Sequence, residues 1–329
     1  MLYDNHGRLI NYVRLAVTDR CNLRCFYCMP EEGIKFSPRL ELLSYEEMER
    51  IIRVLTDLGV NKVRITGGEP FVRRDLMQFI GKIAALDGIK KIALTTNGVL
   101  TAPHVKHFKS LKINSVNLSL DSLDPVRFFE VTRRDEFPAV MKTLDELLLH
   151  DIDVKINSVV MQGQNEQDLL ALVEMTRQLP VSVRFIEEMP FNGSGQHYKE
   201  WVWDYRRIIA HIREQYPTLH KIPDPPHSTS SNYAIEGHLG TVGVIAAYSR
   251  TFCGTCNRLR LTPQGLLKTC LYDSGIFNVR DILRAGATDA ELAALFQDAI
   301  GHRFKDGHEA EANRFMNGPV TESMATIGG

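Results

Sequence analysis

The chain is poor in cysteine and tryptophan, with only six and two of them in 329 residues. It also has no apolar run long enough to span a bilayer. The pattern of a secretory signal, a charged segment followed by an apolar one, is also missing from its start. We therefore expect a cytoplasmic protein with no membrane contact. In the cytoplasm cysteines stay reduced, and structural disulfides are uncommon.

Neither sign of charge dominates the composition. The chain has 39 basic and 40 acidic residues, a formal net charge of -1 and a pI near 6.8. This balance provides no global basic field, so it argues against a nucleic-acid-binding protein. The hydrophobic fraction of 44% is enough for a large core in one or two domains. The sequence contains no fixed-period repeat and no low-complexity tract.

The six cysteines form two triplets with none left over: Cys21, Cys25 and Cys28, then Cys253, Cys256 and Cys270. Zinc or a four-iron cluster takes four ligands, so three thiolates leave one metal position open. An open position binds something that reacts, so the pattern indicates an enzyme with two reactive metal centres. The alternatives are disulfides, half of a zinc site at the first triplet, and a zinc ribbon completed by His302 or His308 at the second.

Short β-rich runs alternate with amphipathic stretches over the first 190 residues. The predicted strands are 13–17, 62–66, 91–95, 115–120, 154–160 and 181–186, and the predicted helices are 45–58, 74–86, 103–111, 139–150 and 166–178. Parallel strands need crossover connections of this length. Six such units predict an α/β fold, either a partial (β/α)6 TIM-like barrel or an open doubly wound sheet. We favour the partial barrel, with residues 1–190 as its domain.

The pattern changes in residues 191–329, which we expect to form a C-terminal domain carrying the second cysteine triplet. A strand is predicted at 240–248, a hairpin from 258 onward, and helices at 276–283 and 289–296. The stretch 321–327 has little structural pattern. This domain need not fold alone, and we expect it to close over the mouth of the barrel.

Polar residues follow successive predicted strands at the edge where parallel α/β proteins place their chemistry. The first cysteine triplet follows the first strand, and Gly67-Gly68-Glu69-Pro70 follows the second. Thr95 to Gly98 and then Ser119 end the next two. Adjacent glycines allow a ligand to approach the backbone closely, and the glutamate offers an anchor for an amine. Two adjacent glycines alone often mark only a turn. The prediction of a ligand site therefore rests on the glycines, the glutamate and the cysteine triplet together.

Four predicted strands carry a cation in the middle, although parallel strands buried on both faces should be apolar. These cations are Arg14, Arg64, Lys155 and Arg184. An unpaired buried charge is costly. Asp153, Glu187 or Glu188 could neutralise one or two of the cations, but four of them are better explained by an internal pocket for a phosphate chain. Arg258 and Arg260 lie two residues apart beside the second triplet, so on a strand both side chains would point the same way. They either form a solvated face or bind further phosphate oxygens.

Three features together resemble the radical S-adenosylmethionine superfamily: the spacing of the first triplet, Tyr27 before its last cysteine, and the Gly-Gly-Glu-Pro motif. The resemblance implies a four-iron cluster on Cys21, Cys25 and Cys28. Its open iron would chelate the amino and carboxylate groups of S-adenosylmethionine. Reduction would then cleave that ligand to a 5′-deoxyadenosyl radical.

A closer resemblance covers nearly the whole chain. The run from Cys253 to Thr262, the Phe-Ile-Glu-Glu-Met-Pro run from Phe185 and the terminal Gly328-Gly329 are similar to the GTP 3′,8-cyclases that begin molybdenum cofactor biosynthesis. The resemblance implies a second four-iron cluster on Cys253, Cys256 and Cys270, whose open iron takes the guanine base. It also implies an S-adenosylmethionine site of Tyr27, Gly68, Glu69, Ser119 and Met189. Glu69 would bind the amino group. The implied GTP contacts are Arg14, Arg64, Thr95, Lys155, Arg184, Arg258 and Arg260, and the implied catalytic group is Arg258, Arg260, Gly328 and Gly329.

The same resemblance implies a reaction and partners. The radical would take the C3′ hydrogen of GTP, and the sugar radical would attack guanine C8 to give (8S)-3′,8-cyclo-7,8-dihydroguanosine 5′-triphosphate. An external one-electron reductant and a downstream cyclic pyranopterin monophosphate synthase are the expected partners of a monomer or homodimer. Two alternatives stay open. One is a radical enzyme that acts on a peptide, and the other is a non-enzymatic zinc or iron–sulfur redox sensor.

Overall fold

The computed structural model describes residues 1–30, 33–189, 203–315 and 323–328. Its strands are β1 (Tyr12–Ala16), β2 (Lys62–Thr66), β3 (Lys91–Thr96), β4 (Ile113–Ser119), β5 (Asp153–Val160), β6 (Ser182–Glu187), β7 (His220–Lys221), β8 (Ser231–Ala234), β9 (Thr241–Ile245), β10 (Arg258–Leu261), β11 (Leu266–Lys268) and β12 (Phe277–Asn278). Its α-helices are α1 (Tyr45–Asp57), α2 (Leu76–Ala84), α3 (Pro125–Thr132), α4 (Phe137–Leu149), α5 (Leu169–Gln178), α6 (Tyr205–Gln215), α7 (Val279–Arg284), α8 (Asp289–Gly301), α9 (Gly307–Phe315) and α10 (Met324–Ile327).

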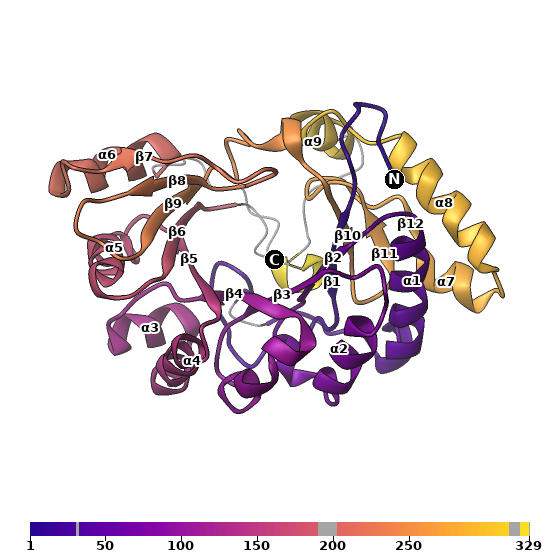
Figure 1. The fold of residues 1–329 in the computed structure, drawn as a ribbon, viewed down its shortest axis with the longest axis horizontal. Coiled ribbons are helices and arrows are strands. Elements are labelled where there is room, and N and C mark those ends of the chain that lie inside the picture. Colours follow the sequence, from indigo (N-terminus) through magenta and orange to yellow (C-terminus); the bar gives the residue numbers. More distant parts are fainter. Residues whose placement is uncertain (31–32, 190–202, 316–322, 329) are drawn as a thin grey trace.

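All of these strands belong to one curved sheet, in the order β12-β11-β10-β1-β2-β3-β4-β5-β6-β9-β8-β7. The strands from β10 through β1–β6 to β9 run parallel, and antiparallel hairpins extend both edges. Within the described ranges no pairing joins the two edges. The sheet curves around a central space, with α1 to α5 outside the curve (Figure 1). The predicted α/β partial barrel is confirmed.

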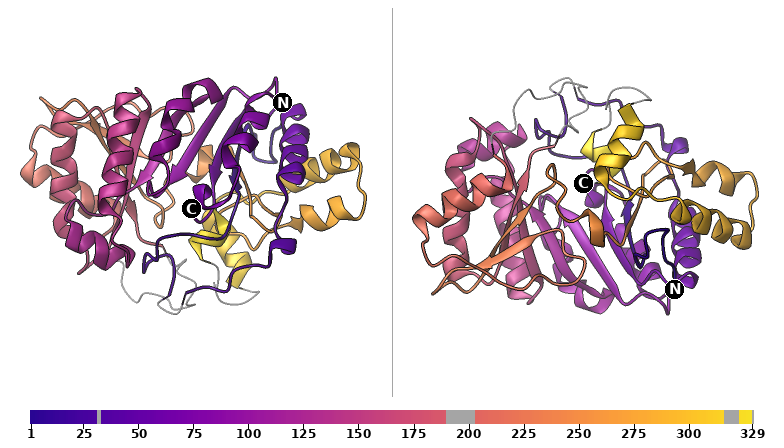
Figure 2. Two further views of the ribbon diagram at one scale, coloured as in Figure 1. Left: turned by 90° about the horizontal axis from the view of Figure 1, so that it is seen from below. Right: turned by 90° about the horizontal axis from the view of Figure 1, so that it is seen from above.

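The later part of the chain contributes strands to both edges of this sheet. Strand β10 pairs with β1, and β9 pairs with β6, both in parallel. Views from below and from above show orange segments of the later chain beside the parallel strands (Figure 2). Two parallel strands are therefore added to the six that the sequence predicted.

Local sequence explains the longest of the predicted helices. The side chain of Ser44 accepts a hydrogen bond from the backbone of Glu47, and the Glu47 side chain accepts one from the backbone of Ser44, which is a complete capping box. Helix α1 then buries Ile51 and Leu55 against the outer face of the sheet. Its apolar residues recur at helical spacing, so most of its stability comes from this packing.

Several elements differ from the prediction. Residues 103–111 form two 3-10 helices, Ala102–His107 and Lys109–Leu111, because Pro103 cannot donate an amide bond and the turns close through i to i+3 bonds. Helices α3 and α6 were not predicted, although Asp124 and Asp204 cap them. The predicted helix at 276–283 begins three residues later, after β12.

The tail contains a helix that was not predicted. Helix α10 forms within the stretch expected to lack structure, with Ser323 as its cap and Ala325 and Ile327 buried. It lies inside the curve of the sheet (Figure 1). Gly329 and the expected domain boundary at 190/191 lie outside the described residues. In the part of the chain that the structure describes, no helix is long and apolar enough to cross a membrane.

Candidate functional site

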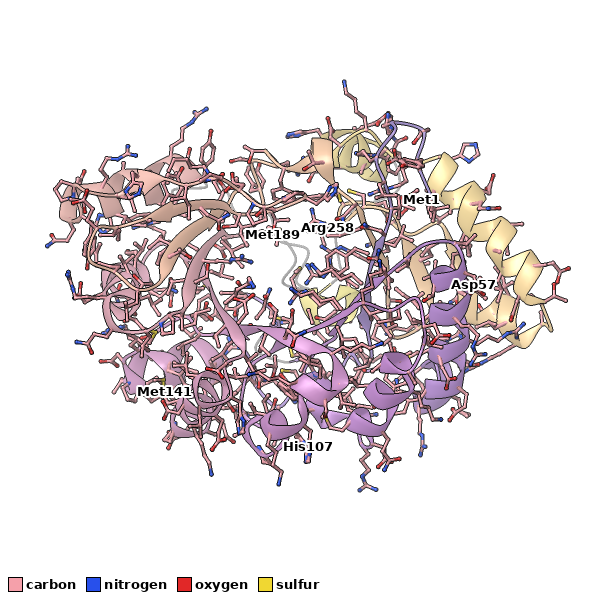
Figure 3. All side chains as sticks on the ribbon, viewed as in Figure 1. Met1, Asp57, His107, Met141, Met189 and Arg258 are labelled. Carbon is pink, nitrogen blue, oxygen red and sulfur yellow. The ribbon has the colours of Figure 1, made fainter. Side chains whose placement is uncertain are left out.

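The register of the sheet gathers cations on its inner face. Strands β10, β1 and β2 pair so that Arg258, Tyr12 and Lys62 lie side by side, and Arg260, Arg14 and Arg64 form the next row. Lys91 extends the first row on β3. Residues paired in a parallel sheet point to the same face. Nitrogen-bearing side chains accordingly gather around the central space near Arg258 (Figure 3).

These strands are polar on the inner face and apolar on the outer one. Val63 and Ile65 alternate with the inner residues of β2 and are fully buried in the core. Further along the sheet, Lys155 of β5 and Arg184 of β6 also line the central cavity. The inner cations therefore serve a cavity rather than the packing between sheet and helices.

Neutralisation by local carboxylates accounts for few of these cations. Asp153 pairs with Lys155, as the alternative expected. Glu187 instead accepts bonds from the backbone of Tyr205 and from Ser249. The buried Nε of Arg184 has no hydrogen-bond partner among the described residues. Burial lowers the pKa of Arg184 to about 10, with Arg64 adding to the effect.

The central cavity has a volume of about 470 Å³. It is lined by Arg14, Arg64, Lys155, Arg184, Arg258 and Arg260, together with all three cysteines of the second triplet. Positive charge and three soft thiols thus share one chamber. Hydrogen bonds from guanidinium groups suit phosphate oxygens, so the chamber can hold a phosphorylated ligand beside a metal cluster.

Tyr12 is an acidic group within this cationic wall. Arg64 Nε donates to its hydroxyl at 2.6 Å, and Lys62 Nζ lies 4.4 Å from its ring centroid. Burial raises its pKa, but Arg64, Arg14 and Lys62 outweigh burial and lower the pKa to about 7. The cations of the chamber therefore bring ionisation of Tyr12 into the neutral pH range.

We expect Tyr12 to titrate near neutral pH in the ligand-free protein. Because folding lowers its pKa from about 10, the phenolate contributes fully to stability above about pH 10, and the contribution is lost as pH falls through about 7. Tyrosinate absorbance should rise around neutrality, and this rise should vanish in Tyr12→Phe. Unfolding free energy should increase with pH more in the parent than in this variant.

Tyr45 provides the control for this titration, because burial raises its pKa. Tyr45→Phe should leave the absorbance change near neutral pH in place. A parent protein with no such change would contradict the electrostatic argument.

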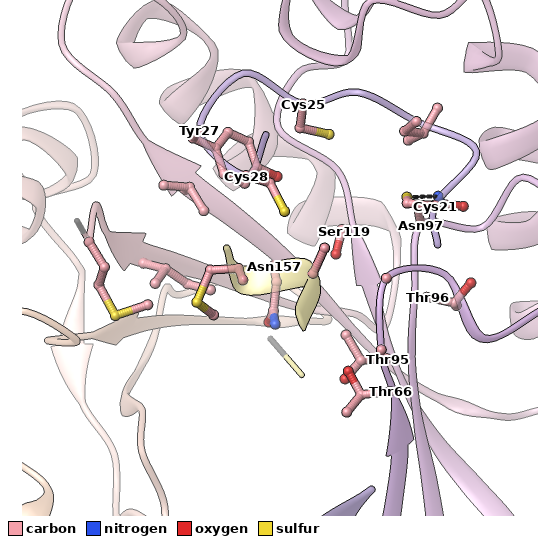
Figure 4. Close-up of a pocket in the computed structure, with 18 of the residues that line it drawn as sticks. Cys21, Cys25, Tyr27, Cys28, Thr66, Thr95, Thr96, Asn97, Ser119 and Asn157 are labelled. Atoms are coloured by element: carbon pink, nitrogen blue, oxygen red, sulfur yellow. Dashed lines mark hydrogen bonds between the residues drawn. The ribbon is translucent and has the colours of Figure 1, made fainter. Parts of the chain in front are cut away.

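A second, smaller cavity of about 180 Å³ lies at the carboxyl ends of the strands. Its wall carries Cys21, Cys25 and Cys28 (Figure 4). Tyr27, Gly68, Ser119 and Met189, which were predicted to bind the cofactor, line it too. Thr95, predicted to contact GTP, lines this cavity rather than the central one and accepts a bond from Arg64.

Gly68 allows the loop after β2 to press against the cysteine loop. A Cβ at this position would lie 2.2 Å from the carbonyl oxygen of Arg20, a distance that no side chain tolerates. The two loops are tied by bonds from Gly68 N to Thr18 O and from Glu69 N to Arg20 O, each 2.8 Å. The glycine therefore holds the first cysteine loop against the sheet.

Glu69, which was predicted to bind an amino group, is buried between two loops. Its carboxylate accepts bonds from the backbone of Asn97 at 2.7 Å, the backbone of Phe71 at 3.1 Å and the hydroxyl of Thr96. Burial raises its pKa to about 7. Among the described residues it is not one of those lining the smaller cavity. Glu69 thus ties the loops after β2 and β3 together, and its contact with an amino group stays a prediction.

Side chains from distant elements orient the first cysteine loop. The hydroxyl of Tyr27 donates to Asp121 at 2.9 Å, and Asn97 Nδ2 donates to Cys21 Sγ at 3.6 Å (Figure 4). Ser323, which caps α10, donates to the carbonyl of Cys28 at 2.5 Å. The tail helix therefore contacts the first cysteine triplet.

The donor sets fit iron–sulfur clusters. All six cysteines are free thiols. Among the described residues, no three His, Cys, Asp or Glu side chains converge as ligands of a single metal ion do. Each triplet instead lines the wall of one cavity, which is the arrangement needed for three irons of a cluster whose fourth iron is open.

The two cavities share part of their walls. Asn157, Ile186, Met189 and Met324 line both. Asn157 and Ile186 project from the inner face of β5 and β6, and Met324 belongs to α10. The two cavities therefore lie next to each other, with these four side chains between them.

Two family models match consecutive parts of the chain. "Radical SAM superfamily" matches residues 15–176, and "Molybdenum Cofactor Synthesis C" matches residues 181–309. The partial barrel and its cysteine loop thus define the radical S-adenosylmethionine class, whose members use a four-iron cluster and S-adenosylmethionine.

Relatives narrow this class. A "GTP 3',8-cyclase" of Syntrophomonas wolfei is 41% identical over 321 residues, covering 96% of this chain and 98% of that protein. "Molybdenum cofactor biosynthesis protein 1" of Mus musculus is 42% identical over 303 residues, covering 92% of this chain and 48% of that protein. The chain belongs to the GTP 3′,8-cyclase family. It spans about half the length of the animal relatives that it matches.

A solved structure supports the fold alone. "Streptococcus suis SuiB bound to S-adenosylmethionine" aligns with a TM-score of 0.61 at 17% sequence identity, over 88% of this chain and 68% of that one. This likeness agrees with the curved parallel sheet described above.

The sequence prediction left several lining residues unassigned. Tyr12, Lys62, Lys91 and Asn157 were given no role. A readable signal existed, because each lies an even number of residues from a predicted site residue on its own strand. Extending the two-residue period along every strand would have found them.

Proposed function

We propose that the chain is a GTP 3′,8-cyclase that uses two four-iron clusters. It converts GTP into (8S)-3′,8-cyclo-7,8-dihydroguanosine 5′-triphosphate, with electrons from an external one-electron reductant. A cyclic pyranopterin monophosphate synthase would consume the product. The observation that carries this proposal is the shared wall between a cysteine-lined cavity and a cationic, cysteine-lined chamber.

The two halves of the chain would divide the work. Residues 1–190 would bind S-adenosylmethionine, and residues 191–329 would supply the second cluster and two phosphate anchors. When bound, the first cluster and S-adenosylmethionine supply a 5′-deoxyadenosyl radical that takes the C3′ hydrogen. Tyr27, Gly68, Ser119 and Met189 would shape the pocket for S-adenosylmethionine, and Glu69, fixed between two loops, would bind its amino group. This placement limits contact between the radical and water.

The central chamber would hold GTP with its phosphates against the cationic rows. Arg14, Arg64, Lys155, Arg184, Arg258 and Arg260 would bind phosphate oxygens, and the second cysteine triplet would place the base. Thr95 would contact GTP from the wall of the smaller cavity, where it accepts a bond from Arg64. Arg260 also donates to the carbonyl of Gly328 at 2.9 Å, so substrate binding and the tail meet at one guanidinium.

The function is tested by anaerobic incubation of the reconstituted protein with reductant, S-adenosylmethionine and each nucleotide in turn. Mass spectrometry should find 5′-deoxyadenosine and a cyclised nucleotide with GTP only. Cleavage that depends on a peptide rather than a nucleotide would favour the peptide-modifying alternative. Zinc without sulfide would favour the non-enzymatic alternative.

Replacing Arg184 by alanine should weaken GTP binding about 10- to 100-fold, because a charged hydrogen bond of about 1.5–3 kcal/mol is lost. Its buried Nε without a partner among the described residues motivates this choice. Arg184→Lys should rescue binding only partly, since the planar fork is lost. Equilibrium binding of GTP measures the effect.

Arg177 supplies a matched control. Its guanidinium pairs with Glu174 on the surface of α5, and half of its side chain is exposed. Arg177→Ala should leave GTP binding unchanged. Equal affinity in both alanine variants would remove Arg184 from the phosphate site.

A further inference from the structure

Arg8 and Arg303, from opposite ends of the chain, donate hydrogen bonds to the loop that carries Cys253 and Cys256. Arg8 donates from Nη1 to the carbonyl of Cys253 at 3.2 Å and to the carbonyl of Lys305 at 2.6 Å. Its Nη2 donates to the carbonyl of Phe304 at 2.8 Å. The N-terminal arm is thereby bound to the loop that carries Cys253 and to the segment after α8.

Arg303 joins the two segments that carry the other thiols. Its guanidinium donates to the carbonyl of Cys256 at 3.2 Å and to the carbonyl of Thr269, the residue before Cys270, at 2.9 Å. It also donates to the carbonyl of Arg258 at 3.2 Å, and its Nη2 lies 3.6 Å from Cys256 Sγ. One side chain thus sets the distance between the Cys256 loop and the Cys270 hairpin.

Asp4 links these two arginines. Its Oδ2 accepts from Arg8 Nε at 2.6 Å and from Arg303 Nη1 at 3.2 Å. Its side chain is fully buried, and those of Arg8 and Arg303 are 9% and 3% exposed. Two cations and one anion are therefore packed against the cysteine loop, and this trio carries a net positive charge.

A buried positive charge and an N–H donor near a cluster thiolate favour the cluster state with the extra electron, because both stabilise negative charge on sulfur. Such charges act strongly where water is excluded. Arg303 meets both conditions at Cys256. Asp4 opposes part of its field.

We propose that Asp4, Arg8 and Arg303 are positioning residues that hold the cluster of Cys253, Cys256 and Cys270 and tune its reduction potential. This inference rests on the two-cluster part of the proposed function. Arg303 raises the potential, and Asp4 limits the rise by neutralising one of the two guanidinium groups.

The test uses the full chain with Cys21, Cys25 and Cys28 replaced by alanine, so that only the second cluster can form. Iron and sulfide are counted after reconstitution, and the potential is measured by redox titration followed by electron paramagnetic resonance. Arg303→Met should shift the potential to more negative values. Asp4→Asn should shift it to more positive values. A merely structural role would not produce shifts of opposite sign.

Arg284→Met is the matched control, because this arginine also belongs to the C-terminal segment but pairs with Glu47 at 2.7 Å on the surface. The reduction potential of the second cluster in this variant should equal that of the parent. Arg303→Lys covers the case in which the methionine variant binds no iron. The lysine keeps the charge but cannot bridge both carbonyls, so it should retain more iron and show a smaller shift.

The outcomes separate two failures. If the parent with only the second triplet takes up no iron and sulfide, the two-cluster proposal fails, and this inference fails with it. If the parent holds a cluster while the Arg303 and Asp4 variants match Arg284→Met in iron content and potential, the inference alone is overturned. Shifts of the same sign in both variants also overturn the tuning role.

Discussion

Replacing Cys21, Cys25 and Cys28 by alanine should abolish reductive cleavage of S-adenosylmethionine while leaving the second cluster in place. The first triplet lines the smaller cavity beside Gly68, whereas the second triplet lines the central chamber. The parent should contain about eight iron and eight sulfide per chain, and this variant about four of each. Iron and sulfide assays and the yield of 5′-deoxyadenosine measure these results.

Replacing Cys253, Cys256 and Cys270 serves as the reciprocal control. This variant should keep about four iron and still cleave S-adenosylmethionine without coupling to cyclisation. Its GTP binding should weaken, because the cysteines share the chamber with the cationic rows. If both variants lost cleavage equally while each still held one cluster, the two sites would not divide the work as proposed.

Much of this site could be predicted from the sequence because its signals are local. The spacing of three cysteines, two adjacent glycines, and a cation inside an otherwise apolar strand can each be read from a few neighbouring residues. Arg14 and Arg64 illustrate this point. Parallel strands place their carboxyl ends at one edge, so residues that follow successive strands must come together. Register then brings the two arginines side by side.

The remainder depended on long-range contacts that no local pattern specifies. Arg303 looks like one more surface cation at the end of a helix, yet it reaches Cys256 and Asp4. Tyr12 reads as an ordinary strand residue, and only the cations on neighbouring strands change its acidity. Glu69 is a related case. Its motif predicts a ligand contact, but nothing in the motif specifies the bond that its carboxylate accepts from the backbone of Asn97 in the next loop.

The tail shows why weak local pattern does not imply a free end. A helix of four residues has little stability alone, and its order comes from contacts. Gly328 ends α10 at φ +77°, and its carbonyl accepts from the buried Arg260. A Cβ on Gly328 would lie 3.1 Å from Ala16 and from Thr66. Gly328 therefore packs closely between the ends of β1 and β2, where a side chain would be crowded and its positive φ strained.

Deleting Gly328 and Gly329 should cut cyclisation at least about tenfold, which corresponds to about 1.4 kcal/mol of transition-state stabilisation, while both clusters and most GTP binding remain. The loss would arise because the Gly328 carbonyl no longer orients Arg260 in the wall of the central cavity. Gly328→Ala should act in the same direction. Gly286→Ala is the control, since Gly286 also has positive φ but has nothing within 4 Å of its Cβ position. That variant should keep full cyclase activity, and full activity in the truncated chain would show that the tail has no catalytic part.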